Sequence, residues 1–231
     1  MNERRHLVLT CAARYGVGHL KPFVESWRRH VPNCDLVMFV DLVAPETVAW
    51  LIGAGVQVLP ASLSLAPPGI GWRRLARHVA LRTGMNLLCA WTKACGAPAE
   101  DRAPRVREAM LDLSASRFSD YLRYLNLCRY RYAGVVLADC RDLVFQSSPF
   151  PCGGLHVFAE NESIGTSHFA KRWFQLTYGT AAWRELSARP FLCSGVTTGD
   201  SESIHRYLQC MVRECGKVMA GAGEDQAVHN Y

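Results

Sequence analysis

The stretch HLVLTCAARYGVGHLKPFVESWRRHVPNCDLVMFVD, residues 6–41, decides the fold class. Its first seven residues, 6–12, form a short apolar run that is typical of a buried strand. Residues 19–30 follow as an expected helix, because apolar side chains recur there at steps of four. A second apolar run, residues 35–40, predicts another strand. The stretch therefore has the order strand, helix, strand of a parallel β/α unit.

The same alternation continues beyond this stretch. Pro45 and Glu46 open a further expected helix, and residues 56–59 form a third short strand. Parallel sheets bind ligands outside the carboxyl ends of their strands. The segment 10–15, which ends the first strand, and Asp41, which ends the second, are therefore candidate ligand contacts. We expect an α/β fold with a Rossmann-like mixed central sheet flanked by helices.

The composition is that of a globular protein. The chain has 231 residues, of which 49% are hydrophobic and 20% charged. These values exclude the disordered, collagen-like and low-complexity classes. With 26 basic and 20 acidic residues the net charge is +6, which suits phosphate-bearing partners. No nucleic-acid-binding module is recognisable, so nucleic acid is not an expected partner.

Ten cysteines are present, and no two are spaced as C-x-x-C. This spacing argues against a zinc ribbon or a thioredoxin-type motif. The N-terminal residues lack the longer apolar stretch of a signal peptide. We therefore expect a cytoplasmic protein whose cysteines are mostly small buried hydrophobes, with the inner face of the membrane as an alternative location.

Residues 62–112 break the alternation of strands and helices. Within them, residues 72–91 have the pattern of a basic amphipathic helix between two loops. Two interpretations are open. The segment is an insertion that contacts an acceptor or makes peripheral membrane contact, or it is a core-packed helix with a solvated basic face.

The last half of the chain returns to regular elements. The pattern predicts helices over 115–129 and 168–178, and strands over 134–138, 155–160 and 191–199, the last ending in a glycine turn. Asp200 is expected to cap a final apolar-striped helix that runs to Gly216. No internal repeat and no interdomain linker is visible, which indicates a single domain.

The segment VVLADCRDLVFQSSPF, residues 135–150, carries the most chemical information. An apolar strand delivers Asp139 and Asp142 to its carboxyl end, where an unpaired carboxylate is costly to desolvate. A divalent cation would offset that cost, and Mg²⁺ or Mn²⁺ suits carboxylate oxygens. The alternative is a salt bridge, to Arg141 or another arginine.

Two further segments contain residues suited to binding or catalysis. CSGVTTG, residues 193–199, contains small residues that let the backbone approach a sugar or phosphate closely. GEDQAVHN, residues 223–230, combines two acids with a polar amide, as a general base and its neighbours would. The alternative for this second segment is an ordinary acidic helix start.

In this order, the three segments resemble the strand–D-x-D, N-S-G-hydrophobic and D-Q-x-x-x-N segments of GT-A type glycosyltransferases. The resemblance covers most of the chain and implies one domain over residues 1–231. Within it, 1–61 would be the nucleotide-binding β/α half, 62–112 a variable helical insertion, and 113–231 the half that binds metal, donor sugar and acceptor. The implied reaction moves a sugar from a nucleotide-sugar donor, a UDP- or GDP-sugar, to a hydroxyl of a glycan or small molecule.

The resemblance also implies roles for single residues. Asp139 matches the first acid of the motif, which contacts the donor ribose or the metal. Arg141 stands where the second acid is usual, and Asp142 follows one position later. Either Asp139 and Asp142 hold Mn²⁺ or Mg²⁺, or Arg141 neutralises the diphosphate without a metal. Asp225 matches the acid that deprotonates the acceptor or positions the sugar. The implied donor-binding residues are Thr10, Ala12, Tyr15, Arg117, Asp139, Arg141, Ser194 and Gly195.

Other interpretations of these residues stay open. His229 is either a metal ligand or an ordinary histidine on a helix surface. The irregular acidic motif allows a catalytically silent GT-A-like module that binds nucleotide-sugars. Cys193 stands where asparagine is frequent in the family. Paired aspartates at a strand end also serve nucleotidyl and phosphoryl transferases.

Overall fold

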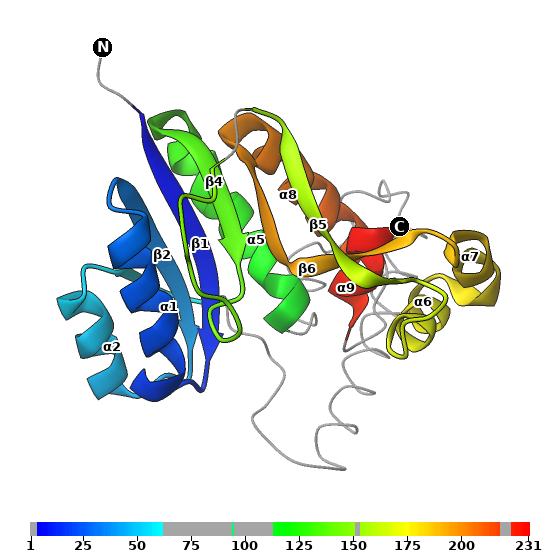
Figure 1. Cartoon of the computed structure of the whole chain (residues 1–231), viewed down its shortest axis with the longest axis horizontal. Coiled ribbons are helices and arrows are strands. Elements are labelled where there is room, and N and C mark those ends of the chain that lie inside the picture. The colour runs from blue at the N-terminus through cyan, green and yellow to red at the C-terminus, as the bar shows by residue number, and fades with distance from the viewer. Residues whose placement is uncertain (1–3, 62–93, 95–112, 151–152, 218–222) are drawn as a thin grey trace.

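The computed structural model describes residues 4–61, 94, 113–150, 153–217 and 223–231. It is an α/β fold, in which a mixed six-stranded sheet carries helices on both faces (Figure 1). The basic helix expected over 72–91 lies outside the described residues.

The elements of the first part are β1 (Arg5–Ala13), α1 (Val17–His30), β2 (Cys34–Asp41), α2 (Pro45–Gly53) and β3 (Gln57–Pro60). The elements of the second part are α5 (Leu113–Cys128), η2 (Arg129–Arg131), β4 (Tyr132–Ala138), β5 (Leu155–Ser163), α6 (Ala170–Thr177), α7 (Gly179–Leu186), β6 (Pro190–Asp200), α8 (Ser201–Cys215) and α9 (Glu224–Asn230). The strands and helices expected in the described ranges are confirmed, with ends that differ by a few residues. Helix α7 was not expected; it follows α6 directly, across Gly179, whose φ of 87° is in the left-handed region.

The order of strands in the sheet is β3-β2-β1-β4-β6-β5. Strands β1, β2 and β3 are parallel, and β4 is parallel to β1. The last two strands differ, because β6 runs antiparallel to both β4 and β5. The chain thus builds the sheet outward from β1 to β3 and then returns to place β4 on the other side of β1. In open α/β sheets, the carboxyl ends of the two strands at such a switch point border the ligand crevice.

Successive side chains of each strand point to opposite faces of the sheet. In β1, Leu7 and Leu9 pack with α5 and α8, whereas Val8 packs with α1. The same alternation in β4 sends Val135 to the first core and Val136 to the second. Both cores are closed to solvent, so the sheet holds α5 and α1 at fixed positions on opposite faces.

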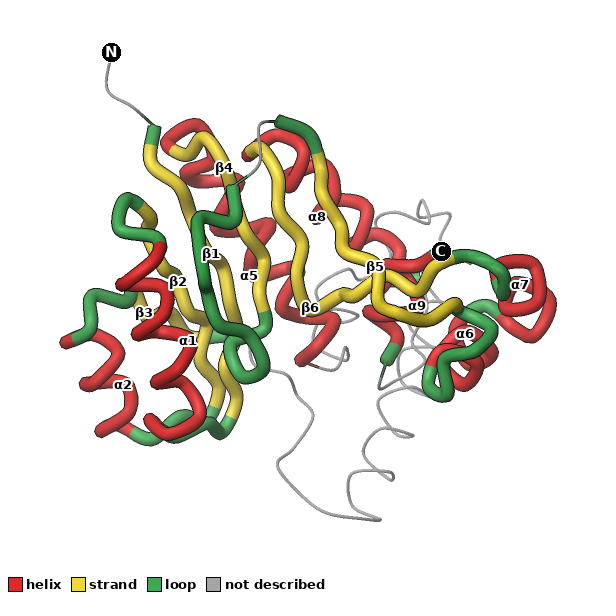
Figure 2. The backbone as a smooth tube through the Cα atoms, viewed as in Figure 1, coloured by secondary structure: helices red, strands yellow, loops and turns green. Residues whose placement is uncertain are grey.

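The loop after β4 is anchored to the α1 face. Figure 2 shows that this loop, residues 139–150, returns along the sheet toward the start of β5. The ring of Phe145 packs 5.3 Å from that of Phe23 on α1, and Phe150 stacks 4.0 Å from the ring of His6. The apolar half of the 135–150 segment therefore has a structural purpose, and it fixes the acidic half at the carboxyl edge.

Strand β6 is irregular where the sequence suggested a turn. Val157 of β5 pairs with Thr197, but the next residue, Phe158, pairs with Cys193. Residues 194–196 thus bulge away from β5. Ser194 and Gly195 lie inside this strand, not in the glycine turn that was expected. Asp200 does cap α8, since its carboxylate accepts a hydrogen bond of 2.7 Å from the backbone N–H of Ser203.

Two broader expectations can be compared with the described part of the chain. None of its helices is both long and apolar enough to cross a bilayer. The seven cysteines it contains are free thiols, and four of them are buried: Cys34, Cys128, Cys140 and Cys215. Burial as small apolar side chains is therefore confirmed for these four.

Candidate functional site

A hollow of about 190 Å³ lies at the carboxyl edge of the sheet, between the ends of β1 and β4. We call it the carboxyl-edge hollow. It is lined by Cys11, Ala13, Tyr15, Ser114, Arg117, Asp139, Cys140, Arg141 and Asp142. This is the switch point of the sheet, where the topology alone places a ligand.

Arg117 on α5 is the centre of charge in this hollow. Its guanidinium donates to the carboxylate of Asp139, which follows β4, and lies 3.3 Å from Oδ2 of Asp225 on α9. The Arg117 side chain is 12% exposed, that of Asp139 44% and that of Asp225 8%. Burial lowers the pKa of Arg117, but the nearby carboxylates outweigh burial and raise it overall. The arginine is therefore a permanent positive charge that ties two segments 86 residues apart (225 − 139).

The carboxylate of Asp139 is held against β6. The backbone N–H of Asp139 donates a hydrogen bond of 2.8 Å to the carbonyl of Gly195. A Cβ added at Gly195 would lie only 3.1 Å from Oδ2 of Asp139. Glycine at this position therefore lets the strand pass beside the carboxylate, and Asp139 has one side against β6 and the other open to the hollow.

Helix α9 fixes β6 through two side-chain amides. Asn230 accepts from the backbone N–H of Leu192 at 2.7 Å and donates to its carbonyl at 2.9 Å. Gln226 accepts from the backbone N–H of Ser194 at 3.0 Å and donates to the carbonyl of Leu192. Sequence reasoning named neither amide as a site residue. The available signal was their spacing of four, which puts both on one side of a helix.

Asp225, the acid expected at the acceptor, lies behind Arg117 as seen from Asp139. Arg117 lies between Asp225 and Asp139, and Asp225 is not among the residues that line the carboxyl-edge hollow. The two acids therefore do not face each other across an open cleft of the described structure. In this arrangement Asp225 holds and orients the guanidinium.

Two of the donor residues expected on β1 are also displaced. Thr10 and Ala12 are completely buried and do not line the hollow, whereas Cys11 and Ala13 do. The reason is the alternation of the strand, because residues 11 and 13 point to the face that carries α5 and Arg117. Tyr15 does line the hollow.

The acidic loop brings Arg141 and Asp142 to the same hollow. The Arg141 guanidinium lies 5.9 Å from the centre of the Tyr15 ring, in a cation–π contact. Asp142 is 83% exposed and lies 3.9 Å from Arg141. The described residues contain no group of three or more His, Cys, Asp or Glu that could hold a metal ion. Asp139 and Asp142 are thus two carboxylates with an arginine beside each, and not a closed ligand set.

His229 is neither in a described metal cluster nor an ordinary surface histidine. The Tyr207 hydroxyl lies 2.7 Å from its Nδ1. Burial, with a smaller effect of the Arg117 charge, lowers the pKa of His229 to about 4. At neutral pH the ring is therefore uncharged and shares a hydrogen bond with the Tyr207 hydroxyl.

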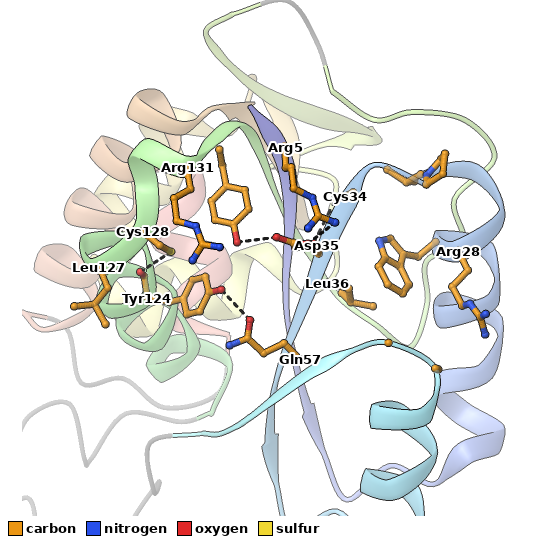
Figure 3. Close-up of a pocket in the computed structure, with 16 residues that line it drawn as sticks. Arg5, Arg28, Cys34, Asp35, Leu36, Gln57, Tyr124, Leu127, Cys128 and Arg131 are labelled. Atoms are coloured by element: carbon orange, nitrogen blue, oxygen red, sulfur yellow. Dashed lines mark hydrogen bonds and ion pairs between the residues drawn. The ribbon is translucent and has the colours of Figure 1, made fainter. Parts of the chain in front are cut away.

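A larger hollow lies at the other edge of the sheet. It has a volume of about 620 Å³ and is lined by residues such as Arg5, Asp35 and Tyr124 (Figure 3). We take the smaller hollow as the candidate functional site, because volume alone does not define a site. The smaller one combines the switch point with two carboxylates and two arginines.

No protein-family model matches this chain. No curated protein sequence matches it either. The inference of function therefore rests on the geometry of the carboxyl-edge hollow and on the motif resemblance described above.

Proposed function

We propose that this chain is a GT-A type glycosyltransferase that moves a sugar from a nucleoside-diphosphate donor to a hydroxyl acceptor. The observation that carries the proposal is the Arg117–Asp139 pair at the carboxyl edge between β1 and β4. The order of parts supports it too. A parallel β/α half is followed by β4, which ends in the acidic motif, and then by β6 and α9, which hold the other two motifs.

In this reaction the bond between the anomeric carbon and the diphosphate breaks, and the diphosphate takes the electron pair. The acceptor oxygen forms the new bond to the anomeric carbon, and its proton passes to the departing diphosphate or to water. Arg117 and Arg141 both line the hollow and would stabilise the charge that develops on it. The exposed side of Asp139 would accept a hydrogen bond from a donor hydroxyl. Asp225 would act as a positioning residue, since it contacts Arg117 outside the lining of the hollow.

A divalent cation is part of the proposal as a second source of positive charge. Asp139 and Asp142 are the carboxylates that would hold Mn²⁺ or Mg²⁺. Together with Asp225 they outnumber the two arginines of the hollow by one charge (3 − 2). A diphosphate adds more negative charge, which a bound cation would offset.

The test is a thermal-shift and product assay with UDP-, GDP- and CMP-sugars, each with and without manganese. We expect one donor to raise Tm and to release an intact nucleoside diphosphate. Asp139→Asn should remove the shift, while Glu185→Gln on α7 removes an exposed negative charge elsewhere and should keep it. If no donor gives a shift or a product, the proposal fails.

The same assay separates the alternatives. A donor that raises Tm without any product identifies the silent nucleotide-sugar-binding module, which the Arg117 bridge between Asp139 and Asp225 favours. Release of inorganic phosphate or pyrophosphate in place of the nucleoside diphosphate identifies phosphoryl or nucleotidyl transfer.

A further inference from the structure

The hollow at the amino edge of the sheet is a second candidate binding site. We call it the amino-edge hollow. It lies where β1, β2 and β3 begin and where α1 and α5 end. Its volume of about 620 Å³ is within the range of small-molecule sites, which is roughly 300–1,000 Å³. Because it lies at the opposite edge from Asp139, an inference about it does not depend on the proposed transfer reaction.

The charge of this hollow is positive. Arg5, Arg28 and Arg131 line it, with Asp35 as the one carboxylate among its described lining residues. Asp35 is already satisfied, since Arg5 lies 2.7 Å from one oxygen and the Tyr132 hydroxyl donates to the other at 3.0 Å. Within the described chain, Arg131 has no carboxylate partner and contacts the Tyr132 ring at 6.0 Å. Its charge is therefore available to a ligand.

The negative ends of two helices offset only part of this positive charge. Helices α1 and α5 both end at the hollow, and a helix C-terminus carries roughly half a negative charge. Basic residues in the last turn of α1, such as Arg28, offset that dipole. In Figure 3, Arg28 lies on the far side of the hollow, while Arg131 and Tyr124 lie together on the other side of Arg5 and Asp35. Two arginines, Arg5 and Arg131, therefore remain near one another on the α5 side.

The walls between these arginines are aromatic and polar. The rings of Tyr124 and Tyr132 line the hollow, and the Tyr124 hydroxyl donates 3.1 Å to the Gln57 side chain. Burial, with Tyr124 and Asp35 as further causes, raises the pKa of Tyr132. Both phenols thus stay neutral at physiological pH. Tyr132 is only 2% exposed, so the half-buried Tyr124 ring is the one that can offer a flat face to a planar ligand.

We propose that the amino-edge hollow binds a small anion that carries a planar ring, of the class of nucleoside monophosphates. Arg131 and Arg5 would bind the phosphate as charge-assisted hydrogen-bond donors. The Tyr124 ring would stack on the base, and the Gln57 amide would contact its edge.

The experiment is isothermal titration of the full chain with uridine and adenosine monophosphates, with uridine, and with inorganic phosphate. We expect a monophosphate to bind at least about tenfold more tightly than either fragment, because ring and phosphate contribute separately. Arg131→Glu should weaken binding by about tenfold or more, since hydrogen bonds to charged groups are worth about 1.5–3 kcal/mol. Tyr124→Ala should weaken the binding of the monophosphate and leave the affinity for inorganic phosphate unchanged.

Two control variants decide where the nucleotide binds. Arg172→Glu on the exposed side of α6 makes the same charge change away from the hollow and should leave the affinity unchanged. Arg141→Ala, in the carboxyl-edge hollow, should affect only a monophosphate bound at the donor site and should leave unchanged the binding that Arg131→Glu weakens. Loss of that binding in Arg141→Ala, equal losses in Arg131→Glu and Arg172→Glu, or no monophosphate binding below about 1 mM would each overturn the proposal. If Arg131→Glu loses the monophosphate but still transfers sugar, the amino-edge hollow binds its ligand independently of the proposed transfer reaction.

Discussion

Gly195 passes so close to Asp139 that a side chain between them has no room, with only 3.1 Å from a built Cβ to Oδ2 of the carboxylate. Asp139 also donates its backbone N–H to the carbonyl of Gly195. The carboxylate that Arg117 binds is thus positioned by the bulge of β6 as well as by the end of β4. A side chain at Gly195 would therefore move the carboxylate that Arg117 binds.

Gly195→Ala tests this packing. The added methyl must displace the carboxylate by a few tenths of an ångström, and overpacking of this kind costs about 1–3 kcal/mol. We expect donor affinity to fall about tenfold, as measured by titration with the active sugar nucleotide. The control is Gly18→Ala on α1, where a Cβ meets nothing within 4 Å. Unchanged donor affinity in Gly195→Ala would show that Asp139 does not contact the donor.

Arg117→Ala tests the bridge between the two acids. It removes a guanidinium from the buried carboxylate of Asp225, and breaking a buried pair costs about 3–5 kcal/mol. Urea unfolding should show this loss. In the double variant Arg117→Ala/Asp225→Asn, the loss of unfolding free energy should be smaller than the sum of the losses in the two single variants. The reason is that the double variant leaves no buried carboxylate at position 225. Arg213→Ala, an exposed arginine that pairs with Glu214, should change little. Strictly additive losses would contradict the bridge.

Asn230→Ala tests the attachment of α9 to β6. It leaves the backbone N–H of Leu192 without the side-chain oxygen that accepts from it at 2.7 Å. An unsatisfied buried donor costs about 1–3 kcal/mol, which urea unfolding should detect. Gln175→Ala removes a half-buried amide whose one hydrogen bond within the described residues is to the exposed Thr180 hydroxyl, and it should cost less than about 0.5 kcal/mol. Equal costs for the two variants would mean that Asn230 does not secure the strand.

The fold was predictable because its signals are local. Apolar runs of four to eight residues mark β1, β2 and β4, and a stripe at steps of four marks α1. The site was predictable only in part. Asp139 and Arg117 were named from the motif and its neighbouring helix. The choice between Thr10 and Cys11 was not accessible, because it depends on which face of the sheet α5 covers.

The role of Asp225 shows the same limit. The sequence places an acid at the start of a helix but gives no information about its partner, and Arg117 lies 108 residues earlier in the chain. Long-range pairing of this kind depends on how α5 and α9 pack on the sheet. Gln226 and Asn230, by contrast, had a local signal, since two amides four residues apart lie on one helix face.

Arg141→Ala and Asp142→Asn separate the two sources of positive charge in the hollow. We expect Arg141→Ala to weaken donor binding about tenfold with or without manganese, because it removes a charge-assisted donor to the diphosphate. Asp142→Asn should reduce only the part of the affinity that manganese adds. Titrations with the donor at both metal conditions measure this. Donor binding that is unchanged in Arg141→Ala would remove that arginine from the mechanism.

The lowered pKa of His229 predicts how the stability of the chain depends on pH. Its pKa is about 4 in the folded chain, against 6.5 for an unperturbed histidine. Between these values the unfolded chain binds a proton that the folded chain does not, so stability rises with pH across this window. The contribution is fully present above about pH 6.5 and is lost as the pH falls toward 4, for a total on the order of 3 kcal/mol.

The measurement is urea unfolding of the native chain and of His229→Gln at several values between pH 4.5 and 7. Glutamine keeps a hydrogen-bonding amide for the Tyr207 hydroxyl but cannot take a proton, so the variant should lose less stability on acidification. Burial also lowers the pKa of His205, with a further effect of Arg129, and both proteins keep that group. The difference between the two pH profiles therefore isolates His229. Parallel profiles would mean that this ring is protonated as easily in the folded chain as in the unfolded one.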